Sequence, residues 1–387
     1  MEKKAGQTGS ILIAGDLFPT ERNVDRFSSG DTGTLFGERL CDLFAGADFA
    51  LCNLEGALTD HPASCRKTGP VKVAPTNAVE AFKRLGIQLC LLANNHVTDG
   101  GGQGVLDTMQ TLDAAGIRHI GAGKDAQSIS RSFVQEVAGM RLGFYNVAET
   151  MYNRPGQHTP GVWLYDEWCV CQELAALRKE CDYLAVLYHG GIEKYPYPSP
   201  EMRKRFHRMA DSGADLVVAQ HTHCIGAQET YGGSLLLYGQ GDFLLKNFLP
   251  GRTDSGLVLE LRIENGRVQP VRHLVRSLDN QYVRYAESQD LSQWDALSAE
   301  LGDEALLATR FKAFCDKELT LYLTAFKSPS LFQRLVRRVA PKTYLKWLRS
   351  KAFRPEDLLF ALHTLRSEQN RETAIEGLEN LMDLKEK

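Results

Sequence analysis

Two histidines one residue apart, His221 and His223, end the apolar run VVAQHTHCIG at residues 217–226. Imidazole nitrogens are good ligands for Zn, Mn and Fe. Residues one apart on an extended chain point the same way, so this pair can share one site. Alone, the pair could equally be two polar side chains where a strand meets a loop. A metal centre needs ligands from several segments, because no single strand can surround an ion.

Other apolar runs end in similar chemistry. The polar residues at or just after their ends are Asp16, Asn53, Glu55, Asn94, Asn95, His96, Asp99, His189 and Glu193. Each residue alone has an ordinary explanation, such as a turn, a helix cap or a buried imidazole. Carboxylate, amide and imidazole groups at five strand ends together favour a metal site. The carboxyl ends of parallel strands meet at one edge of a sheet, where ligands bind in this architecture.

Short apolar runs alternate with amphipathic segments through the first two thirds of the chain. Strands are expected at 10–15, 48–52, 87–93, 141–147, 183–188, 215–219 and 234–239, and helices at 37–45, 77–85, 103–115, 170–180 and 200–212. The strand candidates are nearly continuous in apolar residues, which is typical of strands covered on both faces. Strand–helix alternation of this kind predicts an α/β fold.

The pattern changes towards the C-terminus. Residues 257–275 predict a β-hairpin with its turn at Glu264-Asn265-Gly266. Beyond residue 290 the sequence is mostly helical, so we expect one domain over 9–280 and an α-helical extension over 281–387. The segment 331–354 holds eight Lys or Arg and no acid, and Pro341 is expected to divide it into two helices. It is interpreted either as a solvated helical face or as a basic amphipathic surface for anionic lipid or an acidic partner.

Composition narrows the classes of function. The formal net charge of −3 argues against general nucleic-acid binding. The nine cysteines include no CxxC pair, which makes a disulfide framework unexpected. The apolar run after the charged start is too short for a signal peptide, and no stretch approaches the roughly 18 apolar residues of a membrane span. We expect a cytoplasmic protein, with peripheral membrane contact through 331–354 as the alternative.

Several stretches resemble the CapA family of capsule or poly-γ-glutamate biosynthesis proteins. They are IAGDLF (13–18), ADFALCNLEGALTD (47–60), the segment 91–123 around LLANNHVTDGGG, the segment 185–229 around YHGGIE and QHTH, and LLLYGQGDFLL (235–245). Together they cover residues 9–247 in the family's order, and the part after residue 280 does not contribute. The resemblance implies a calcineurin-like metallophosphatase fold with layers in the order α/β/β/α.

The resemblance also implies roles for individual residues. Asp16, Asn95, His189, His221 and His223 match metal ligands, Glu55 matches the carboxylate that bridges two metals, and His96 matches the imidazole that serves the substrate. Asp99 is a candidate for orienting His96. Asn53, Asn94 and Glu193 are other candidates for the site, without a defined role. The implied cofactor is one or two divalent ions of Mn, Fe or Zn.

Three positions depart from the pattern of the wider superfamily. Phosphatases of this fold usually have D-x-H in the first motif, where this chain has Asp16-Leu17-Phe18. They usually have Gly-Asp in the second, where it has Asn53-Leu54-Glu55. The family typically has Asn where this chain has Asp242. CapA-type proteins tolerate the first two changes. The histidine that is missing from the first motif would be a metal ligand, so one metal position is expected to have one ligand fewer.

The function expected from the resemblance is a metal-dependent hydrolase or transfer enzyme in the biosynthesis of a capsular or cell-surface polymer such as poly-γ-glutamate. Its substrate would be an anionic polymer or a phosphoester, and its partners other capsule-synthesis proteins. Two alternatives stay open: a phosphoesterase that acts on a small phosphorylated metabolite, and a non-catalytic subunit that binds polymer. The fold alone does not choose among them.

Overall fold

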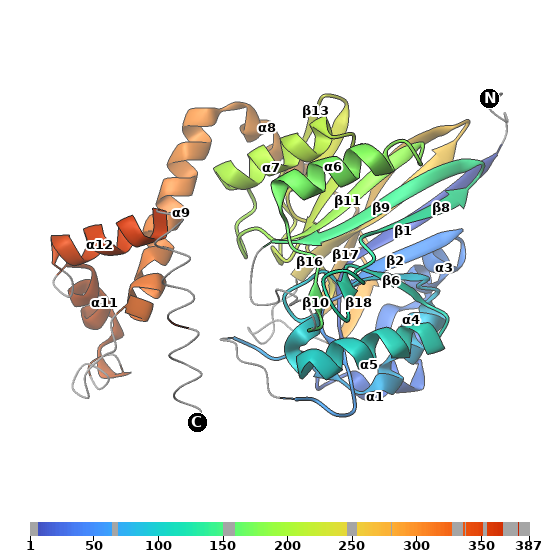
Figure 1. The fold of residues 1–387 in the computed structure, drawn as a ribbon, viewed down its shortest axis with the longest axis horizontal. Coiled ribbons are helices and arrows are strands. Elements are labelled where there is room, and N and C mark those ends of the chain that lie inside the picture. Colours follow the sequence, from blue (N-terminus) through green and yellow to red (C-terminus); the bar gives the residue numbers. More distant parts are fainter. Residues whose placement is uncertain are drawn as a thin grey trace. The chain divides into compact units, whose positions relative to one another are not determined.

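The computed structural model describes residues 7–63, 69–149, 159–245, 254–279, 281–326, 336, 338–350, 354–366 and 378. The chain forms two compact units, Met1–Glu304 and Ala305–Lys387 (Figure 1). The first unit extends past residue 280, the predicted domain boundary, because β18 (Tyr282–Tyr285) pairs with β17 (Arg267–Leu278).

Two large sheets make up the first unit. The first has the order β18, β17, β16 (Asp254–Glu264), β1 (Thr8–Leu17), β2 (Phe49–Leu54), β5 (Leu89–Leu91) and β6 (Arg118–Ile120), with β15 (Asp242–Leu244) also pairing with β1. The second has the order β13 (Gln228–Tyr231), β14 (Ser234–Leu237), β12 (Leu216–Gln220), β11 (Tyr183–His189), β9 (Met140–Ala148) and β8 (Ser132–Val137). The predicted hairpin is confirmed as β16 and β17, which join at Asn265-Gly266.

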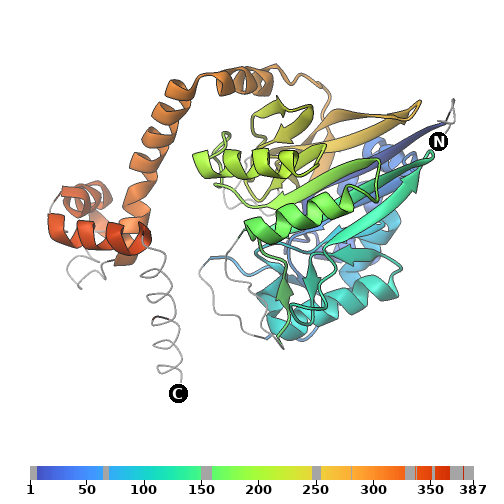
Figure 2. The same ribbon diagram turned by 45° about the horizontal axis from the view of Figure 1, so that its top comes forward.

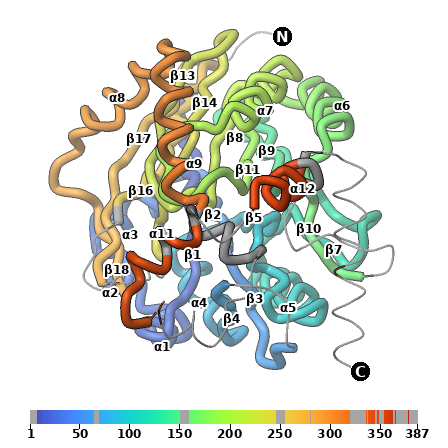
Figure 3. Tube along the Cα trace, turned by 90° about the vertical axis from the view of Figure 1, so that its left-hand side faces the viewer, coloured from blue at the N-terminus to red at the C-terminus, as the bar shows by residue number. Residues whose placement is uncertain are grey.

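Two short strand pairs flank the large sheets (Figure 3). One joins β3 (Ala57–Leu58) to β4 (Val73–Ala74), and the other joins β7 (Ala122–Gly123) to β10 (Gly161–Val162). The pair β3–β4 is important for the site, because it fixes the backbone beside Lys72.

The two sheets pack face to face through apolar side chains. Ile13 of β1 and Leu51 of β2 share a buried cluster with Leu187 of β11. Neighbouring residues on the same strands, such as Ala14 and Cys52, belong to a different buried cluster that includes helix residues. Successive side chains of a strand point to opposite faces. Burial on both faces therefore explains why these strands were continuous rather than alternating in apolar residues.

Helices cover the outer face of each sheet (Figures 1 and 2). Those on the first sheet are α1 (Val24–Ser29), α2 (Thr32–Phe36), α3 (Glu38–Ala45), α4 (Val79–Leu85) and α5 (Gly101–Ala114), and those on the second are α6 (Glu167–Leu177) and α7 (Pro200–Asp211). The unit ends with α8 (Ser292–Ala299), and three short 3-10 helices lie at Thr76–Ala78, Val97–Gly100 and Glu300–Gly302. The predicted layer order α/β/β/α is confirmed.

Within the described residues the second unit consists of helices. They are α9 (Glu304–Phe326), α11 (Pro341–Ser350) and α12 (Pro355–Arg366). Helix α11 begins at Pro341, where the sequence predicted a division. Residues 331–335, 337 and 351–353 of the predicted basic segment lie outside the described residues, so its amphipathic character stays a prediction. Across the part of the chain that is described, no helix has the length and apolar character needed to cross a bilayer.

Candidate metal centre

The predicted site residues meet where strands of both sheets end. Strands β1, β2 and β5 of the first sheet and β11 and β12 of the second deliver them. The prediction that they share the edge of one sheet is therefore wrong: the strands divide between two sheets, and their carboxyl ends converge. The contact between Nδ2 of Asn53 in β2 and Nδ1 of His189 in β11, 3.2 Å apart, joins the two sheets directly.

A row of polar side chains crosses the first sheet. Asp16 is in register with Asn53 on one side and with Asp242 of β15 on the other. The register of β1 shifts between Ala14 and Asp16, as in a β-bulge, a feature that re-aims side chains near functional sites. A side chain at Gly15 would meet the carbonyl oxygen of Gly241 at 2.5 Å, so β15 can approach β1 only because this residue is glycine.

Buried amides hold the row together. Nδ2 of Asn53 donates to Oδ1 of Asp16 at 2.7 Å, and Nδ2 of Asn94 donates to Oδ1 of Asn53 at 3.1 Å. The Asn94 carbonyl oxygen accepts from the backbone N–H groups of His96 and Val97. Asn94 thus shapes the loop that carries His96. Because the Asn53 amide nitrogen can only donate, Nδ1 of His189 accepts, and its Nε2 lies 3.0 Å from Oδ1 of Asn95.

The two histidines of the H-x-H motif lie in a strained loop, not on an extended strand. Strand β12 ends at Gln220, and the backbone φ angles of His221 and His223 are 85° and 50°. The expectation that the pair shares a site because it is extended is wrong. The backbone N–H of His221 donates to Oδ2 of Asp16 at 2.9 Å, which anchors the turn. Left-handed conformations of this kind cost about 1–3 kcal/mol each and cluster at functional sites.

Two groups of side chains have the spacing to hold a metal ion. Ligand atoms of Glu55, His221 and His223 lie within 4.8 Å of one another, and so do ligand atoms of Asp16, His223 and Asp242. His223 belongs to both groups, and its Nδ1 lies 2.7 Å from Oδ1 of Asp242. Sequence reasoning left Asp242 out of the site, although it follows the apolar run of β14 and could have been found as another polar strand end.

Glu55 faces a largely buried lysine that the sequence did not single out. Nζ of Lys72 lies 2.8 Å from Oε1 of Glu55, and the two side chains are 10% and 0% exposed. Lys72 lies in a Val-Lys-Val stretch with no motif that could have marked it. Oε2 of Glu55 and Nδ1 of His221 are buried without a hydrogen-bond partner among the described residues. Buried acceptors left in this way are costly, and a divalent cation would satisfy both, so the donor set fits a metal.

His96 and Asp99 form a second functional pair beside Glu55. Nδ1 of His96 lies 2.6 Å from Oδ2 of Asp99, and its Nε2 lies 3.7 Å from Oε1 of Glu55. The same Asp99 oxygen accepts from the backbone N–H of Lys72 at 2.7 Å. Asp99 therefore fixes the imidazole and turns Nε2 towards the site. Glu193 is more remote: its side chain is 60% exposed and 4.0 Å from Nε2 of His221.

Crowded charges shift the pKa values of the centre. Burial, the charge of Glu55 and that of Asp242 raise the pKa of Asp16 to about 7. Burial alone would lower the pKa of His223, but the adjacent Asp242 raises it to about 9. Burial and His223 lower the pKa of His221 to about 3, and burial holds that of His189 well below its usual value. His221 and His189 are therefore neutral imidazoles ready to bind a metal, whereas His223 and Asp16 must each lose a proton before they can act as ligands.

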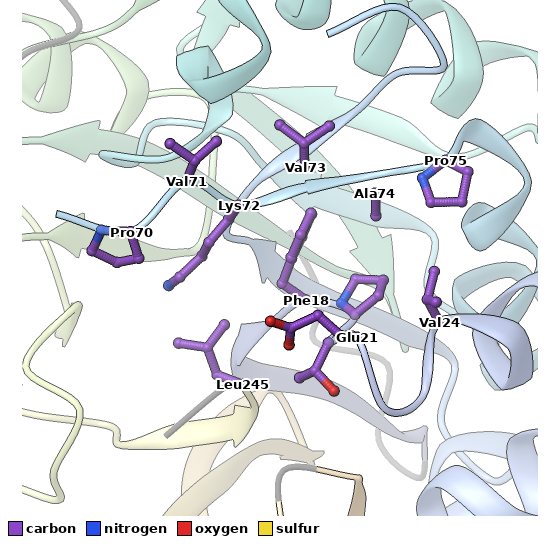
Figure 4. Close-up of a pocket in the computed structure, with 12 residues that line it drawn as sticks. Phe18, Glu21, Val24, Pro70, Val71, Lys72, Val73, Ala74, Pro75 and Leu245 are labelled. Carbon is purple, nitrogen blue, oxygen red and sulfur yellow. The ribbon is translucent and has the colours of Figure 1, made fainter. Parts of the chain in front are cut away.

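A pocket of about 410 Å³ adjoins the centre (Figure 4). Lys72 on one wall connects the two, because its ammonium contacts Glu55. Most of the lining is apolar: Phe18, Pro19, Val24, Pro70, Val71, Val73, Ala74, Pro75 and Leu245, with Thr20 and Glu21 as polar members. Phe18, two residues after Asp16, is an aromatic wall of this pocket at the position where the resemblance implies a histidine.

We expect Lys72→Met to destabilise the metal-free protein much more than the metal-loaded protein. Without the ammonium, the buried Glu55 loses the largest of the positive charges that keep it ionised, and breaking a buried ion pair in this way costs about 3–5 kcal/mol. A bound divalent ion would supply the missing charge. Urea unfolding with EDTA and with Mn²⁺ measures the difference. Lys204→Met is the matched control, since Lys204 pairs with Glu201 at the same 2.8 Å but in solvent. If Lys72→Met lowered the free energy of unfolding equally with EDTA and with Mn²⁺, bound metal would not be replacing the charge of the lost ammonium.

Comparison with known proteins adds the following similarities. A family model described as "Bacterial capsule synthesis protein PGA_cap" matches residues 10–247. The capsule biosynthesis protein CapA of Bacillus anthracis is 29% identical over 202 residues, 50% of this chain and 48% of that protein. A protein of Mycobacterium tuberculosis named "Probable polyglutamine synthesis accessory protein" is 33% identical over 222 residues, 54% of this chain and 58% of that protein. The chain thus matches about half the length of these curated relatives.

Among solved structures, a novel phosphatase from Mycoplasma pneumoniae is similar at a TM-score of 0.46 and 13% sequence identity. The alignment covers 71% of this chain and 95% of that one.

Proposed function

Because this chain belongs to the PGA_cap family of bacterial capsule synthesis proteins, we propose that it is a metal-dependent hydrolase or transfer enzyme that acts on a capsular or cell-surface polymer such as poly-γ-glutamate. The observation that carries the proposal is the donor set of the family-matched segment. Its buried donors converge from two sheets, and two of its atoms, Oε2 of Glu55 and Nδ1 of His221, are left without a hydrogen-bond partner among the described residues.

The metal ligands in this proposal are Asp16, Glu55, Asn95, His189, His221 and His223. Divalent ions held there would supply Lewis acidity and activate water for attack on the substrate. Asn53 and Asn94 orient the ligands and the loop after β5 through their hydrogen bonds to Asp16 and to His96. Glu193, at the exposed rim, has no assigned role in the chemistry.

His96 is the proposed general acid. Asp99 accepts a hydrogen bond from Nδ1–H, so Nε2 faces the substrate; the doubly protonated imidazole would pass its Nε2 proton to the leaving group and return to the neutral form. Lys72 lies between the centre and the pocket, where its ammonium can attract an anionic oxygen of the substrate. The intact His96–Asp99 pair favours an enzyme over a subunit that only binds polymer.

Direct assay of the Mn²⁺-loaded protein tests this proposal. A γ-linked glutamate oligomer should be shortened or transferred, as followed by mass spectrometry, whereas p-nitrophenyl phosphate and bis(p-nitrophenyl) phosphate should react slowly or not at all. Rapid turnover of either phosphate ester with an intact oligomer would identify a phosphoesterase instead. Tight oligomer binding that survives replacement of both His96 and His223, with no turnover of any substrate, would favour a binding subunit.

Metal affinity should increase as the pH is raised from about 6 to 9. In the metal-free protein, the pKa of Asp16 is raised to about 7 and that of His223 to about 9, so each group carries a proton below those values. A ligand must lose its proton to bind metal, and protons therefore compete with the cation on the acidic side. Competition titration with a metal-binding dye at several pH values measures this, and an affinity independent of pH over that range would contradict it.

A further inference from the structure

Asp242 is a second buried carboxylate beside Asp16, in a chain whose first motif lacks the histidine that the resemblance implies. The first motif has Phe18 in place of a histidine, and Phe18 is buried as a wall of the pocket. Strand β15 runs alongside β1 and brings Asp242 into register with Asp16. The Asp242 side chain is 5% exposed, so its carboxylate is held inside the protein beside the other donors.

The distances around Asp242 are those of a compact donor group. Oδ1 of Asp242 lies 2.7 Å from Nδ1 of His223, which in turn lies 3.8 Å from Oδ2 of Asp16. One ligand atom from each of the three residues falls within 4.8 Å of the others. A carboxylate has two oxygens, so one can accept a hydrogen bond while the other binds a cation.

The negative charge of Asp16 and Asp242 also favours the binding of a cation. Asp16 and Asp242 are buried close together, and the nearby ammonium of Lys72 is paired with Glu55 instead. Two buried carboxylates are costly unless positive charge compensates them. The imidazole of His223 beside them can carry one positive charge, and a divalent ion among Asp16, Asp242 and His223 would supply the compensation when His223 binds it as a neutral ligand.

We propose that Asp242 is itself a metal ligand, forming with Asp16 and His223 a position for a divalent cation that replaces the one weakened by the missing histidine. This inference rests on the proposed metal centre and goes beyond it. The position is rich in oxygen donors, a ligand set that suits Mn²⁺ or Mg²⁺. The neighbouring group of Glu55, His221 and His223 is richer in nitrogen, so the two positions differ in chemistry.

The alternative is that Asp242 only orients His223 by accepting its Nδ1 proton. Such partners of metal-binding histidines are common, and their loss also weakens metal binding. The variant Asp242→Asn separates the two roles, because an amide oxygen still accepts the hydrogen bond from His223. It replaces the charged carboxylate by a neutral amide oxygen, so a directly bound ion should be held much more weakly while the hydrogen bond to His223 is kept.

The experiment is a titration of chelator-treated protein with Mn²⁺, followed by equilibrium dialysis and by electron paramagnetic resonance. Wild type should bind two Mn²⁺ per chain with a spin-coupled spectrum. Asp242→Asn should bind one at concentrations that saturate wild type and show an uncoupled six-line spectrum. Glu260→Gln is the matched control: Glu260 is a buried carboxylate 2.8 Å from Nε2 of His273 on β17, and its replacement should leave both equivalents bound.

Each other outcome has a definite meaning. Two equivalents of unchanged affinity in Asp242→Asn would show that Asp242 only orients His223 and would overturn the inference, with the metal centre intact. One equivalent in wild type and one in the variant would also overturn it. No binding by wild type at all would remove the metal centre and the inference together.

Discussion

Replacing His223 by alanine is expected to leave the purified protein without tightly bound metal. Its imidazole belongs to both groups of potential ligands, with Glu55 and His221 on one side and with Asp16 and Asp242 on the other. His221→Ala removes a donor from one group only, so part of the metal should remain. Since loss of even an outer partner lowers metal affinity by about 10- to 100-fold, loss of a shared ligand should exceed that range.

Elemental analysis after reconstitution with Mn²⁺, Fe²⁺ or Zn²⁺ measures the effect. His273→Ala is the control, because His273 is also paired with a carboxylate, Glu260, but lies on β17 outside the centre. Circular dichroism must show that each variant is folded. If His223→Ala kept the metal content of the wild type, His223 would not be a shared metal ligand. If the wild type bound no metal under any condition, the protein would have no metal cofactor.

Replacing His96 by alanine should lower turnover by about 10²- to 10⁴-fold while metal content stays at the wild-type level. The reason is the role proposed for this side chain: its Nδ1 is occupied by Asp99, and its Nε2 is assigned to the substrate and not to a cation. His96 can therefore exchange a proton with the substrate without helping to hold the cation. Asp99→Asn should cause a smaller loss, because it disturbs the orientation of the imidazole and not its presence.

The measurement is turnover of whichever substrate the wild type consumes, paired with metal content of the same samples. The pair of readouts separates the role of His96 from that of His223, whose loss should reduce both. Unchanged turnover in His96→Ala would remove it as the general acid. A parallel loss of metal would instead make it a ligand.

Much of this architecture could be predicted from the sequence. The strands of both sheets that carry the site are short and apolar throughout, and each is followed by polar residues such as those at 94–96 and 221–223. A strand that is buried on both faces needs apolar residues at nearly every position, so its sequence alone identifies it. The helix expected at 200–212 is α7, and Ser199 caps it, its side chain accepting from the N–H of Met202 at 3.2 Å.

What the sequence could not supply is the pairing between distant strands. The division into two sheets, the approach of β15 to β1 and the contact of Lys72 with Glu55 all depend on long-range contacts with no local signal. Asp242 follows an apolar run, but nothing in the sequence shows that its strand lies beside β1. The left-handed turn at His221 and His223 could not be predicted, because it contains no glycine to mark it.

The shifted register of β1 at Gly15 limits how the length of this protein can change during evolution. The side chains of a strand alternate between faces, so gaining or losing one residue between Ile13 and Asp16 would move the carboxylate to the opposite side of the sheet. A one-residue insertion or deletion in β2 or β15 would likewise move Asn53 or Asp242, the neighbours of Asp16, to the opposite side of the sheet. Substitutions can tune this centre, but an insertion or deletion in any of the three strands would abolish it in a single step. Working relatives should therefore vary in length within their loops and keep the residue count of these three strands fixed.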